Sequence, residues 1–278
     1  MDAMAQQDKI TTIDLIRAIL ARNRAALALG ISLTAVVLGT SLVLLVADHS
    51  SVTAVQADLA AERARMVTTI EAHAKQASTT LGRNYIAPEV LKAVSAVPRH
   101  EFVPDGLRGD AYVDQPLPIG YGQTISQPFI VALMTDLVRV GSDDAVLEVG
   151  TGSGYQAAVL AHLARRVYTI EIVPGLADSA ATRLQRLGYT NVVARTGDGY
   201  YGWEEAAPFD SIIVTAAASQ IPPPLIRQLK PEGRMVIPVG APFAVQYLVL
   251  VERGPDDGRV KTRQLLPVRF VPLASGGQ

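Results

Sequence analysis

Gly150-Thr151-Gly152-Ser153-Gly154 is the stretch of the sequence that decides the fold. It follows a short apolar run at 145–149 and precedes a helical pattern at 155–163. A strand, a glycine turn and a helix in this order present backbone N–H groups to a negatively charged ligand. Glycine suits such a turn because it adopts positive φ and lets a ligand approach the backbone closely. The stretch therefore predicts an α/β sheet with a ligand-binding turn at the end of one strand.

An acidic residue ends the next apolar run. Residues 167–170 predict a second strand, and Glu171 follows them directly. A carboxylate about 20 positions after the glycines commonly holds ribose hydroxyls. The glycine spacing is G-x-G-x-G rather than G-x-G-x-x-G, which argues against a nicotinamide or flavin cofactor. We therefore expect a nucleotide-type cofactor of another kind, with a purely structural glycine turn as the alternative.

Composition limits the classes of function. The chain has 278 residues, 49% of them hydrophobic and 18% charged, which is enough for one α/β domain and further segments. Its net charge of −1 provides no global basic field, so we expect no nucleic-acid partner. The absence of cysteine excludes disulfides, a thiolate nucleophile and Cys-ligated metals. The four histidines lack metal-ligand spacing, and we expect no metal site.

Residues 25–47 contain no charged residue and are mostly Leu, Val, Ala and Ile. About 20 apolar residues are enough to cross a bilayer as a helix. A cleaved signal peptide and a buried helix are the alternatives. The run is longer than a signal-peptide core, and a cleavage site after Ala47 would place Leu45 where a small residue is expected. We therefore predict an uncleaved, single-pass transmembrane helix in the lipid bilayer.

The side of the membrane is left open. Lys9, Arg17, Arg22 and Arg24 precede the apolar run, and the positive-inside tendency then places the N-terminus in the cytoplasm and the larger C-terminal part outside. A cofactor that is made in the cytoplasm favours the opposite arrangement.

We expect the chain to divide into a polar lead at 1–24, the transmembrane helix at 25–47, a helical stalk at 48–80 that merges into the domain, and a domain at 81–278. In the domain, strands alternate with helices, which predicts a doubly wound, mostly parallel sheet. No helix separates the last strands, so we expect an antiparallel C-terminal edge. The expected strands are 145–149, 167–171, 191–195, 210–214, 234–239, 246–252 and 264–270, and the helices 88–97, 127–140, 155–164, 174–187 and 222–229.

Two further segments carry candidate site residues. Asp198, in Thr196-Gly197-Asp198-Gly199, follows the third strand and could reach the amino group of a base, or it could cap its own turn. Ser126 lies in a Gly- and Pro-containing loop at 117–128 that leads into a helix, where a hydroxyl could also serve as a cap. No histidine accompanies Ser126, and the G-x-S-x-G motif of hydrolases is absent.

Several blocks together resemble the protein-L-isoaspartate (D-aspartate) O-methyltransferase family. The resemblance covers about residues 60–273 in order, whereas residues 1–55 have no counterpart in the usual members. Its blocks are 97–104 with the loop at 117–128, 147–155, 197–210, 216–218, 225–231 and 236–240. The Thr-Ile-Ser loop and the Gln-Leu-Lys-Pro block make the resemblance specific.

The resemblance implies a Rossmann-like class I methyltransferase fold and S-adenosylmethionine as cofactor. It implies isoaspartyl-containing proteins or peptides as partners. The acceptor would be the side-chain carboxylate of L-isoaspartyl or D-aspartyl residues in damaged proteins. The methyl ester would then cyclise to a succinimide, which initiates repair.

The resemblance also assigns the site. Ser126 takes the family's active-site position, and Ala274 stands where many members carry a hydroxyl residue, which leaves closure by the C-terminal tail in question. The implied cofactor-binding residues are Thr124, Ile125, Gly150, Gly152, Gly154, Glu171, Asp198, Gly199 and Gln246. The three glycines of the turn would hold the methionine portion, Glu171 the ribose, and Asp198 with Gly199 the adenine.

Two alternatives remain beside this function. One is a related methyltransferase for a different carboxylate on a membrane-linked or secreted peptide. The other is a non-catalytic, membrane-tethered interaction module, against which the intact candidate cofactor residues argue.

Overall fold

The computed structural model describes residues 58–241, 244–255 and 258–274. Residues 62–278 form one compact unit, to which the following description applies. The polar lead at 1–24, the transmembrane helix expected at 25–47 and the first part of the expected stalk lie outside the described residues. Within the described part of the chain, no helix combines the length and the apolar character that crossing a membrane requires.

A seven-stranded sheet in the order β5-β4-β3-β6-β7-β8-β9 forms the centre of the unit. The first five strands in this order, β5-β4-β3-β6-β7, run parallel to one another. Strands β8 and β9 pair antiparallel and form the other edge of the sheet. This confirms the predicted mostly parallel sheet. The strands are β3 (Ala145–Val149), β4 (Arg166–Glu171), β5 (Val192–Thr196), β6 (Phe209–Val214), β7 (Leu229–Val239), β8 (Gln246–Arg253) and β9 (Val260–Val268).

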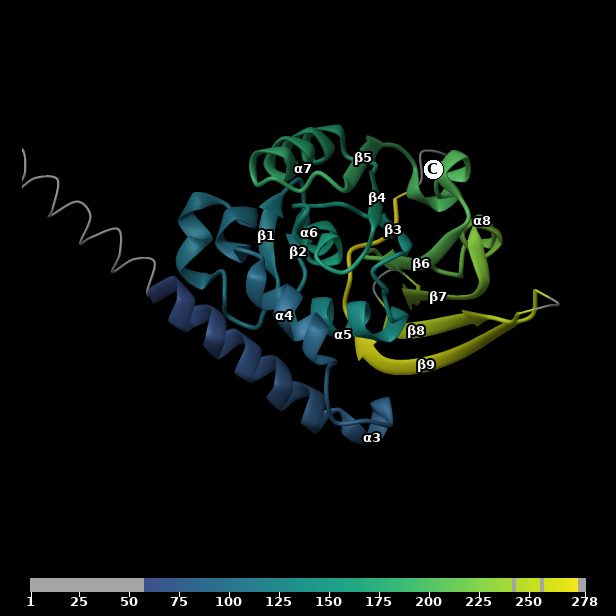
Figure 1. Ribbon diagram of the computed structural model, residues 1–278, viewed down its shortest axis with the longest axis horizontal. Coiled ribbons are helices and arrows are strands. Elements are labelled where there is room, and N and C mark those ends of the chain that lie inside the picture. Colours follow the sequence, from purple (N-terminus) through teal and green to yellow (C-terminus); the bar gives the residue numbers. More distant parts are fainter. Residues whose placement is uncertain (1–57, 242–243, 256–257, 275–278) are drawn as a thin grey trace, which may run out of the picture. The chain divides into compact units, whose positions relative to one another are not determined.

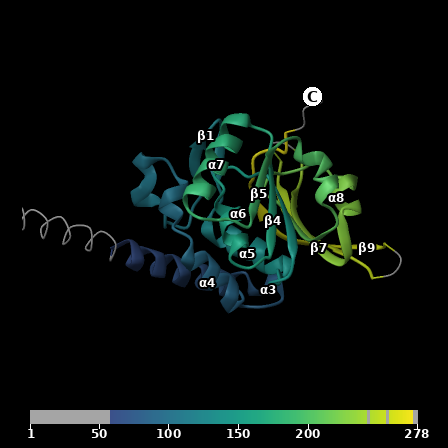
Figure 2. The same cartoon turned by 45° about the horizontal axis from the view of Figure 1, so that its top comes forward.

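Helices cover both faces of the sheet. Figures 1 and 2 show α5, α6 and α7 along one side and α8 on the other. The helices α4, α5, α7 and α8 each begin at a proline, whose missing N–H costs nothing in the first turn. The helices are α3 (Ser78–Leu81), α4 (Pro88–Ala96), α5 (Pro128–Val138), α6 (Tyr155–Ala161), α7 (Pro174–Arg186) and α8 (Pro223–Arg227). Short 3-10 helices are η1 (Arg99–Phe102), η2 (Asp105–Asp110), η3 (Gly199–Tyr201) and η4 (Glu204–Ala206).

The hydrophobic core lies between the sheet and the helices that cover its faces. All residues of β3 are buried, and its apolar side chains pack with those of β4, β6 and β7. Every residue of α5 is also buried, as expected for a helix that is apolar all round. Residues 62–76 are helical, and Met66, Ile70 and Ala74 repeat every fourth residue on their buried face.

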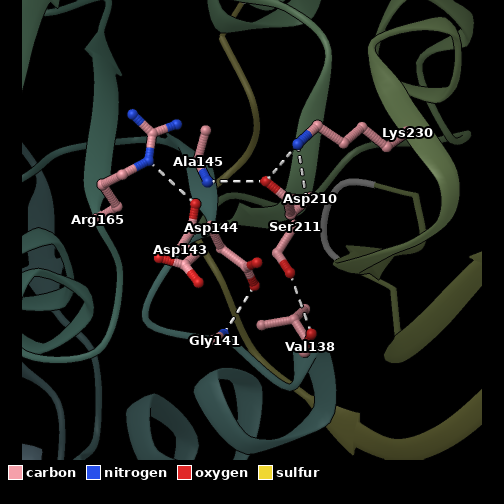
Figure 3. Close-up of polar contacts among 9 residues, drawn as sticks. All are labelled: Val138, Gly141, Asp143, Asp144, Ala145, Arg165, Asp210, Ser211 and Lys230. Carbon is pink, nitrogen blue, oxygen red and sulfur yellow. Dashed lines mark hydrogen bonds and ion pairs between the residues drawn. The ribbon is translucent and has the colours of Figure 1, made fainter.

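Hydrogen bonds and an ion pair connect the first residues of the parallel strands β3, β6 and β7 (Figure 3). The Asp210 carboxylate accepts from Lys230 Nζ at 2.8 Å and from the Ala145 N–H at 2.8 Å. Ser211 Oγ donates to the Val138 carbonyl at 3.0 Å and so joins β6 to the end of α5. These contacts hold β3, β6 and β7 at one end of the sheet. The carboxyl ends of the strands lie at the opposite end.

The segment at 117–128, expected to be a loop, contains a two-stranded hairpin instead. Strands β1 (Leu117–Gly120) and β2 (Gln123–Ile125) pair antiparallel through the turn residues Tyr121 and Gly122. Both turn residues have positive φ, at 53° and 70°, as a two-residue hairpin turn of type I′ requires. Pro118 and the glycines obscure the strand pattern in the sequence.

Candidate active site

Three connected cavities lie at the carboxyl ends of β3, β4 and β6. The first, here called the strand-end cavity, lies directly beside the glycine turn. Gly150, Gly152, Glu171 and Gly199 line it, together with the tail residues 271–274. Strand β3 has β4 on one side and β6 on the other, which is the switch point where ligands bind in such sheets.

The other two cavities adjoin the first. The second, here called the buried cavity because most of its lining residues are buried, borders the glycine turn and is lined by Glu148, Thr151, Tyr155 and Gln156 among others. The open groove is lined by His73, Ser126, Phe129 and residues 266–271 among others. Thr124 and Thr215 line all three spaces and therefore mark the place where they meet.

The glycine turn has the conformation that its sequence predicts. Gly150, Gly152 and Gly154 have φ of 96°, 53° and 88°. A Cβ at Gly150 would collide with Thr215 Oγ1, and one at Gly199 would collide with the Val149 side chain. The backbone at Gly150 and Gly199 thus lies so close to these side chains that only glycine fits at either position.

Glu171 lies beside this turn, as expected. Its carboxylate accepts from the Gly152 N–H at 2.8 Å and from the Val173 N–H at 3.0 Å. The side chain is buried and lines the strand-end cavity. Asp198 Oδ1 accepts from the Tyr200 N–H at 2.9 Å, so the turn-capping role considered for Asp198 is present. Its neighbour Gly199 lines the cavity.

Ser126 does not cap α5. The residue at the N-cap is Gln127, which makes no side-chain cap bond. The cap comes from Asp114, whose carboxylate accepts from the Phe129 N–H at 2.7 Å and from Gln127 Nε2 at 2.8 Å. The half-buried Ser126 borders both the open groove and the buried cavity, and no described residue forms a hydrogen bond with its hydroxyl. Ile125 borders the buried cavity.

Gln246 has a different environment from the other candidates. Its Nε2 donates to the Phe270 carbonyl at 3.0 Å, and its Oε1 accepts from the Phe270 N–H at 2.6 Å. It lines none of the three cavities. The structure makes it a clamp on the chain that leads into the tail.

The tail borders the strand-end cavity although it has Ala274 in place of a hydroxyl residue. The Leu273 N–H donates to the Ala217 carbonyl, and the Ala217 N–H donates to the Val271 carbonyl, each at 2.8 Å. Backbone bonds therefore hold the tail beside the cavity, and this placement does not depend on a side-chain hydroxyl.

Two residues at the site were missed in the sequence. Thr215 Oγ1 lies 2.6 Å from the Gly150 carbonyl and 3.0 Å from the Val149 carbonyl. Its position directly after β6 is the signal that could have identified it, because it follows the strand next to the glycine turn. Arg99 is fully buried, and its Nη2 donates to the Ser126 carbonyl at 2.8 Å. No local sequence pattern connects Arg99 with Ser126, so this contact could not be predicted.

The buried cavity is polar and incompletely paired. Thr169 Oγ1 donates to Glu148 Oε2 at 2.5 Å, but Glu148 Oε1, Tyr155 Oη and Gln156 Oε1 are buried without a hydrogen-bond partner. Burial raises the pKa of Glu148 to about 8 and that of Tyr155 to about 12. Burial also lowers the pKa of Arg99. Unpaired buried polar atoms are costly, so a polar ligand group or water entering this cavity would stabilise them.

These features fit an adenosyl cofactor with an amino-acid end. The strand-end cavity provides the Glu171 carboxylate and glycine-lined walls, and the buried cavity provides polar atoms without a hydrogen-bond partner. The shared position of Thr124 and Thr215 is where a group between the two ends would lie.

Comparison with known proteins identifies the family. The family model for protein-L-isoaspartate (D-aspartate) O-methyltransferase matches residues 77–278. The chain belongs to this family. It is 60% identical over 235 residues to protein-L-isoaspartate O-methyltransferase 2 of Syntrophobacter fumaroxidans, covering 84% of this chain and 95% of that protein. It is 63% identical over 223 residues to protein-L-isoaspartate O-methyltransferase 1 of Cupriavidus necator, covering 80% and 86%.

Solved structures agree with this assignment. A protein-L-isoaspartate O-methyltransferase superposes with a TM-score of 0.66 at 28% identity, covering 77% of this chain and 66% of that one. A Plasmodium falciparum relative in complex with S-adenosyl-L-homocysteine superposes with a TM-score of 0.57 at 26% identity, covering 68% and 91%. The predicted Rossmann-like methyltransferase fold of the domain, the enzyme class, the cofactor and the isoaspartyl methyltransferase activity are therefore confirmed.

Proposed function

We propose that the three cavities divide the methyl transfer among themselves. The strand-end cavity takes the adenosine, the buried cavity takes the amino-acid end, and the open groove takes the isoaspartyl segment of a damaged protein. The meeting of all three spaces at Thr124 and Thr215 carries this proposal, because donor and acceptor must approach along one line. Ser126 borders the groove at the same place.

The residues of the chain have mainly a positioning role. S-adenosylmethionine supplies, when bound, a methyl group on a sulfonium. Ser126 donates a hydrogen bond to the attacking carboxylate or to its peptide, and the hydroxyl has no competing bond among the described residues. No general base is needed, because a carboxylate with an ordinary pKa of about 4 is already ionised at pH 7. Alignment of this kind contributes roughly 7–11 kcal/mol to a barrier.

Residues that line the strand-end and buried cavities bind the parts of S-adenosylmethionine. The turn glycines hold the methionine portion, Glu171 accepts from the ribose hydroxyls, and Asp198 with Gly199 faces the adenine. Thr124 and Ile125 close the junction from the hairpin side. Gln246 acts indirectly, through its clamp on Phe270. The ester then cyclises to a succinimide without further catalysis, and hydrolysis returns part of the material to normal aspartate.

The test is labelled methyl transfer by the full chain to a peptide that contains one isoaspartyl residue, compared with its normal aspartyl isomer. We expect transfer to the first and none to the second. Equal transfer to both would favour the alternative acceptor, another carboxylate on a membrane-linked or secreted peptide, which the apolar run at 25–47 suggests. Calorimetry with S-adenosylmethionine must show binding, and its absence would contradict the proposal.

We also propose that residues 25–47 anchor the chain in a bilayer as a single helix. The charge-free apolar run of sufficient length supports this, and the basic residues before it favour a cytoplasmic N-terminus. The chain has no cysteine, so single variants Gln6→Cys and Gln56→Cys report the two sides directly. We expect the full chain to stay with membranes after an alkaline wash and an impermeant maleimide to label only Gln56→Cys. Release by the wash would contradict the anchor, and the reverse labelling would invert the orientation.

A further inference from the structure

Gln228, at the end of α8, holds the loop that follows Gly199. Its side chain is buried, and both halves of its amide form hydrogen bonds with that loop. Nε2 donates to the Tyr201 carbonyl at 2.8 Å, and Oε1 accepts from the Trp203 N–H at 2.8 Å. A single side chain, 25 residues further along the chain than Trp203, therefore fixes the backbone on both sides of Gly202.

The backbone of Gln228 is itself firmly held. The Phe209 N–H at the start of β6 donates to the Gln228 carbonyl at 2.8 Å, and the Gln228 N–H donates to the Pro224 carbonyl at 3.1 Å. These bonds attach Gln228 both to the central sheet and to α8. Its side chain therefore sets the position of the loop from a rigid support.

Gly202 has a backbone conformation that only a tightly held loop keeps. Its φ of 67° and ψ of −146° lie in a region that is essentially restricted to glycine. A Cβ at this position would collide with Gln228 Oε1. Arg195 Nη2 donates to the Gly202 carbonyl at 3.0 Å, and the guanidinium carbon of Arg195 lies 4.2 Å from the centre of the Trp203 ring. Side chains from β5 and from the end of α8 thus converge on residues 201–203.

The held loop and one wall of the strand-end cavity belong to the same short turn. The Gly202 N–H donates to the Gly199 carbonyl at 3.1 Å, and the Tyr201 N–H donates to the Asp198 carbonyl at 3.3 Å. Gly199 lines the strand-end cavity, and the Val149 side chain lies so close to it that a Cβ would not fit. A shift of residues 201–203 would therefore displace Asp198 and Gly199.

We propose that Gln228 is a positioning residue that determines the selectivity of the enzyme for adenine. This inference rests on the proposed function, which places the adenine against Asp198 and Gly199. Gln228 lines none of the three cavities, so it acts through the loop and not on the cofactor itself.

Selectivity is the property most sensitive to such a shift. Adenine carries an amino group where hypoxanthine carries an oxygen, and a carboxylate accepts a hydrogen bond from the amino group only. Hydrogen bonds weaken steeply when their distance or angle departs from the optimum. A displaced Asp198 would therefore lose its preference for adenine, while contacts to the rest of the cofactor would remain.

The test compares the affinities of S-adenosylhomocysteine and S-inosylhomocysteine for the full-length enzyme by calorimetry. Gln228→Met keeps the length of the side chain but removes the amide. We expect the wild type to prefer the adenosyl ligand and Gln228→Met to lose about 3- to 10-fold of this preference. An unchanged preference in Gln228→Met would overturn the inference. Equal binding of both ligands by the wild type would instead contradict the proposed placement of the adenine.

Two further variants separate positioning from stability. Gln228→Glu keeps an acceptor for the Trp203 N–H but loses the donor to the Tyr201 carbonyl, so we expect a preference between those of the wild type and Gln228→Met. Gln264→Met is the matched control, because this exposed glutamine lies on the edge strand β9. A variant that is merely less stable would bind both ligands more weakly by the same factor. The KM for an isoaspartyl peptide at saturating S-adenosylmethionine should stay at the wild-type value. Wild-type preference in Gln228→Glu, or an equal loss in Gln264→Met, would overturn the inference.

Discussion

The guanidinium of Arg99 lies 4.6 Å from the centre of the Tyr155 ring. Tyr155 opens α6 directly after the glycine turn, and the same guanidinium donates to the Ser126 carbonyl at 2.8 Å. Arg99 Nε also donates to the Ala111 carbonyl at 2.7 Å. One buried cation thus joins the acceptor side of the site to the cofactor side and fixes the distance between them.

Arg99→Ala should lower the free energy of unfolding by roughly 3–5 kcal/mol. The change removes the Arg99 donor from one buried and one half-buried carbonyl, and it removes the side chain that packs on Tyr155. Urea unfolding of the apo protein measures the change. Arg99→Lys is the matched control, since it keeps the positive charge but lacks the planar guanidinium with its several N–H donors. We expect this variant to lose less free energy of unfolding than Arg99→Ala does. Equal losses in both variants would show that lysine cannot replace any of the contacts of the guanidinium.

Ser126→Ala should lower kcat/KM by roughly 10- to 1000-fold, as the loss of one preorganised donor does elsewhere. The affinity for S-adenosylmethionine should fall less than kcat/KM does, because Ser126 borders the buried cavity but does not line the strand-end cavity that takes the adenosine. Ser142→Ala is the control, since that exposed serine lies at the opposite end of the sheet. An unchanged rate for Ser126→Ala would exclude its proposed positioning role.

The fold could be predicted because it depends on local patterns. Alternating apolar runs, proline-initiated helices and the glycine turn all act over short stretches, and the structure confirms the sheet that they indicate. The contacts that organise the site act over long separations instead. Arg99 reaches Ser126 across 27 residues, and Asp114, rather than Ser126, caps α5. The hairpin at 117–125 was missed because proline and glycine mask its alternation. The roles assigned to the cofactor-binding residues stay predictions.

Glu148→Gln should stabilise the apo protein at alkaline pH. Burial raises the pKa of Glu148 to about 8 from an ordinary value of 4.5. The folded state therefore keeps a proton that the unfolded state releases, and stability falls as the pH rises from about 4.5 to about 8. Glutamine is neutral throughout and removes this slope. We expect a gain on the order of 3 kcal/mol at pH 9 relative to pH 5, measured by urea unfolding at several pH values. Parallel pH profiles for the two proteins would contradict this.

Asp114→Ala should lower the free energy of unfolding by about 2 kcal/mol. The buried carboxylate accepts from the first turn of α5 and also meets His73 Nδ1 at 2.6 Å, so its removal frees both the helix end and one wall of the groove. Asp105→Ala is the matched control. Its side chain is 91% exposed and, among the residues that the structure describes, forms an ion pair only with Arg108 at the surface, so we expect a change of about 0–1 kcal/mol. Similar losses for both variants would show that the cap does not stabilise α5.

Gly175→Ala should weaken S-adenosylmethionine binding about 3- to 10-fold. A Cβ at Gly175 would overlap the Tyr121 hydroxyl and lie 2.6 Å from Tyr121 Cζ, so the exposed Tyr121 ring must swing off the start of α7. Residues 123–124 of the hairpin and 171–173 before α7 line the strand-end cavity, and we expect the loss of this contact between hairpin and helix to loosen the cavity. Alanine also favours helix over glycine by about 1 kcal/mol, so stability should not fall and the loss of affinity cannot come from unfolding.

A double-mutant cycle with Tyr121→Ala isolates this contact. If both substitutions act by releasing the hairpin, the double variant should bind S-adenosylmethionine no more weakly than the poorer single variant, by calorimetry. Strictly additive losses would mean that Tyr121 and Gly175 affect the cavity independently. Wild-type affinity in Gly175→Ala would show that the hairpin tip contributes nothing to holding the cofactor, because the ring cannot stay where it is once the Cβ is present.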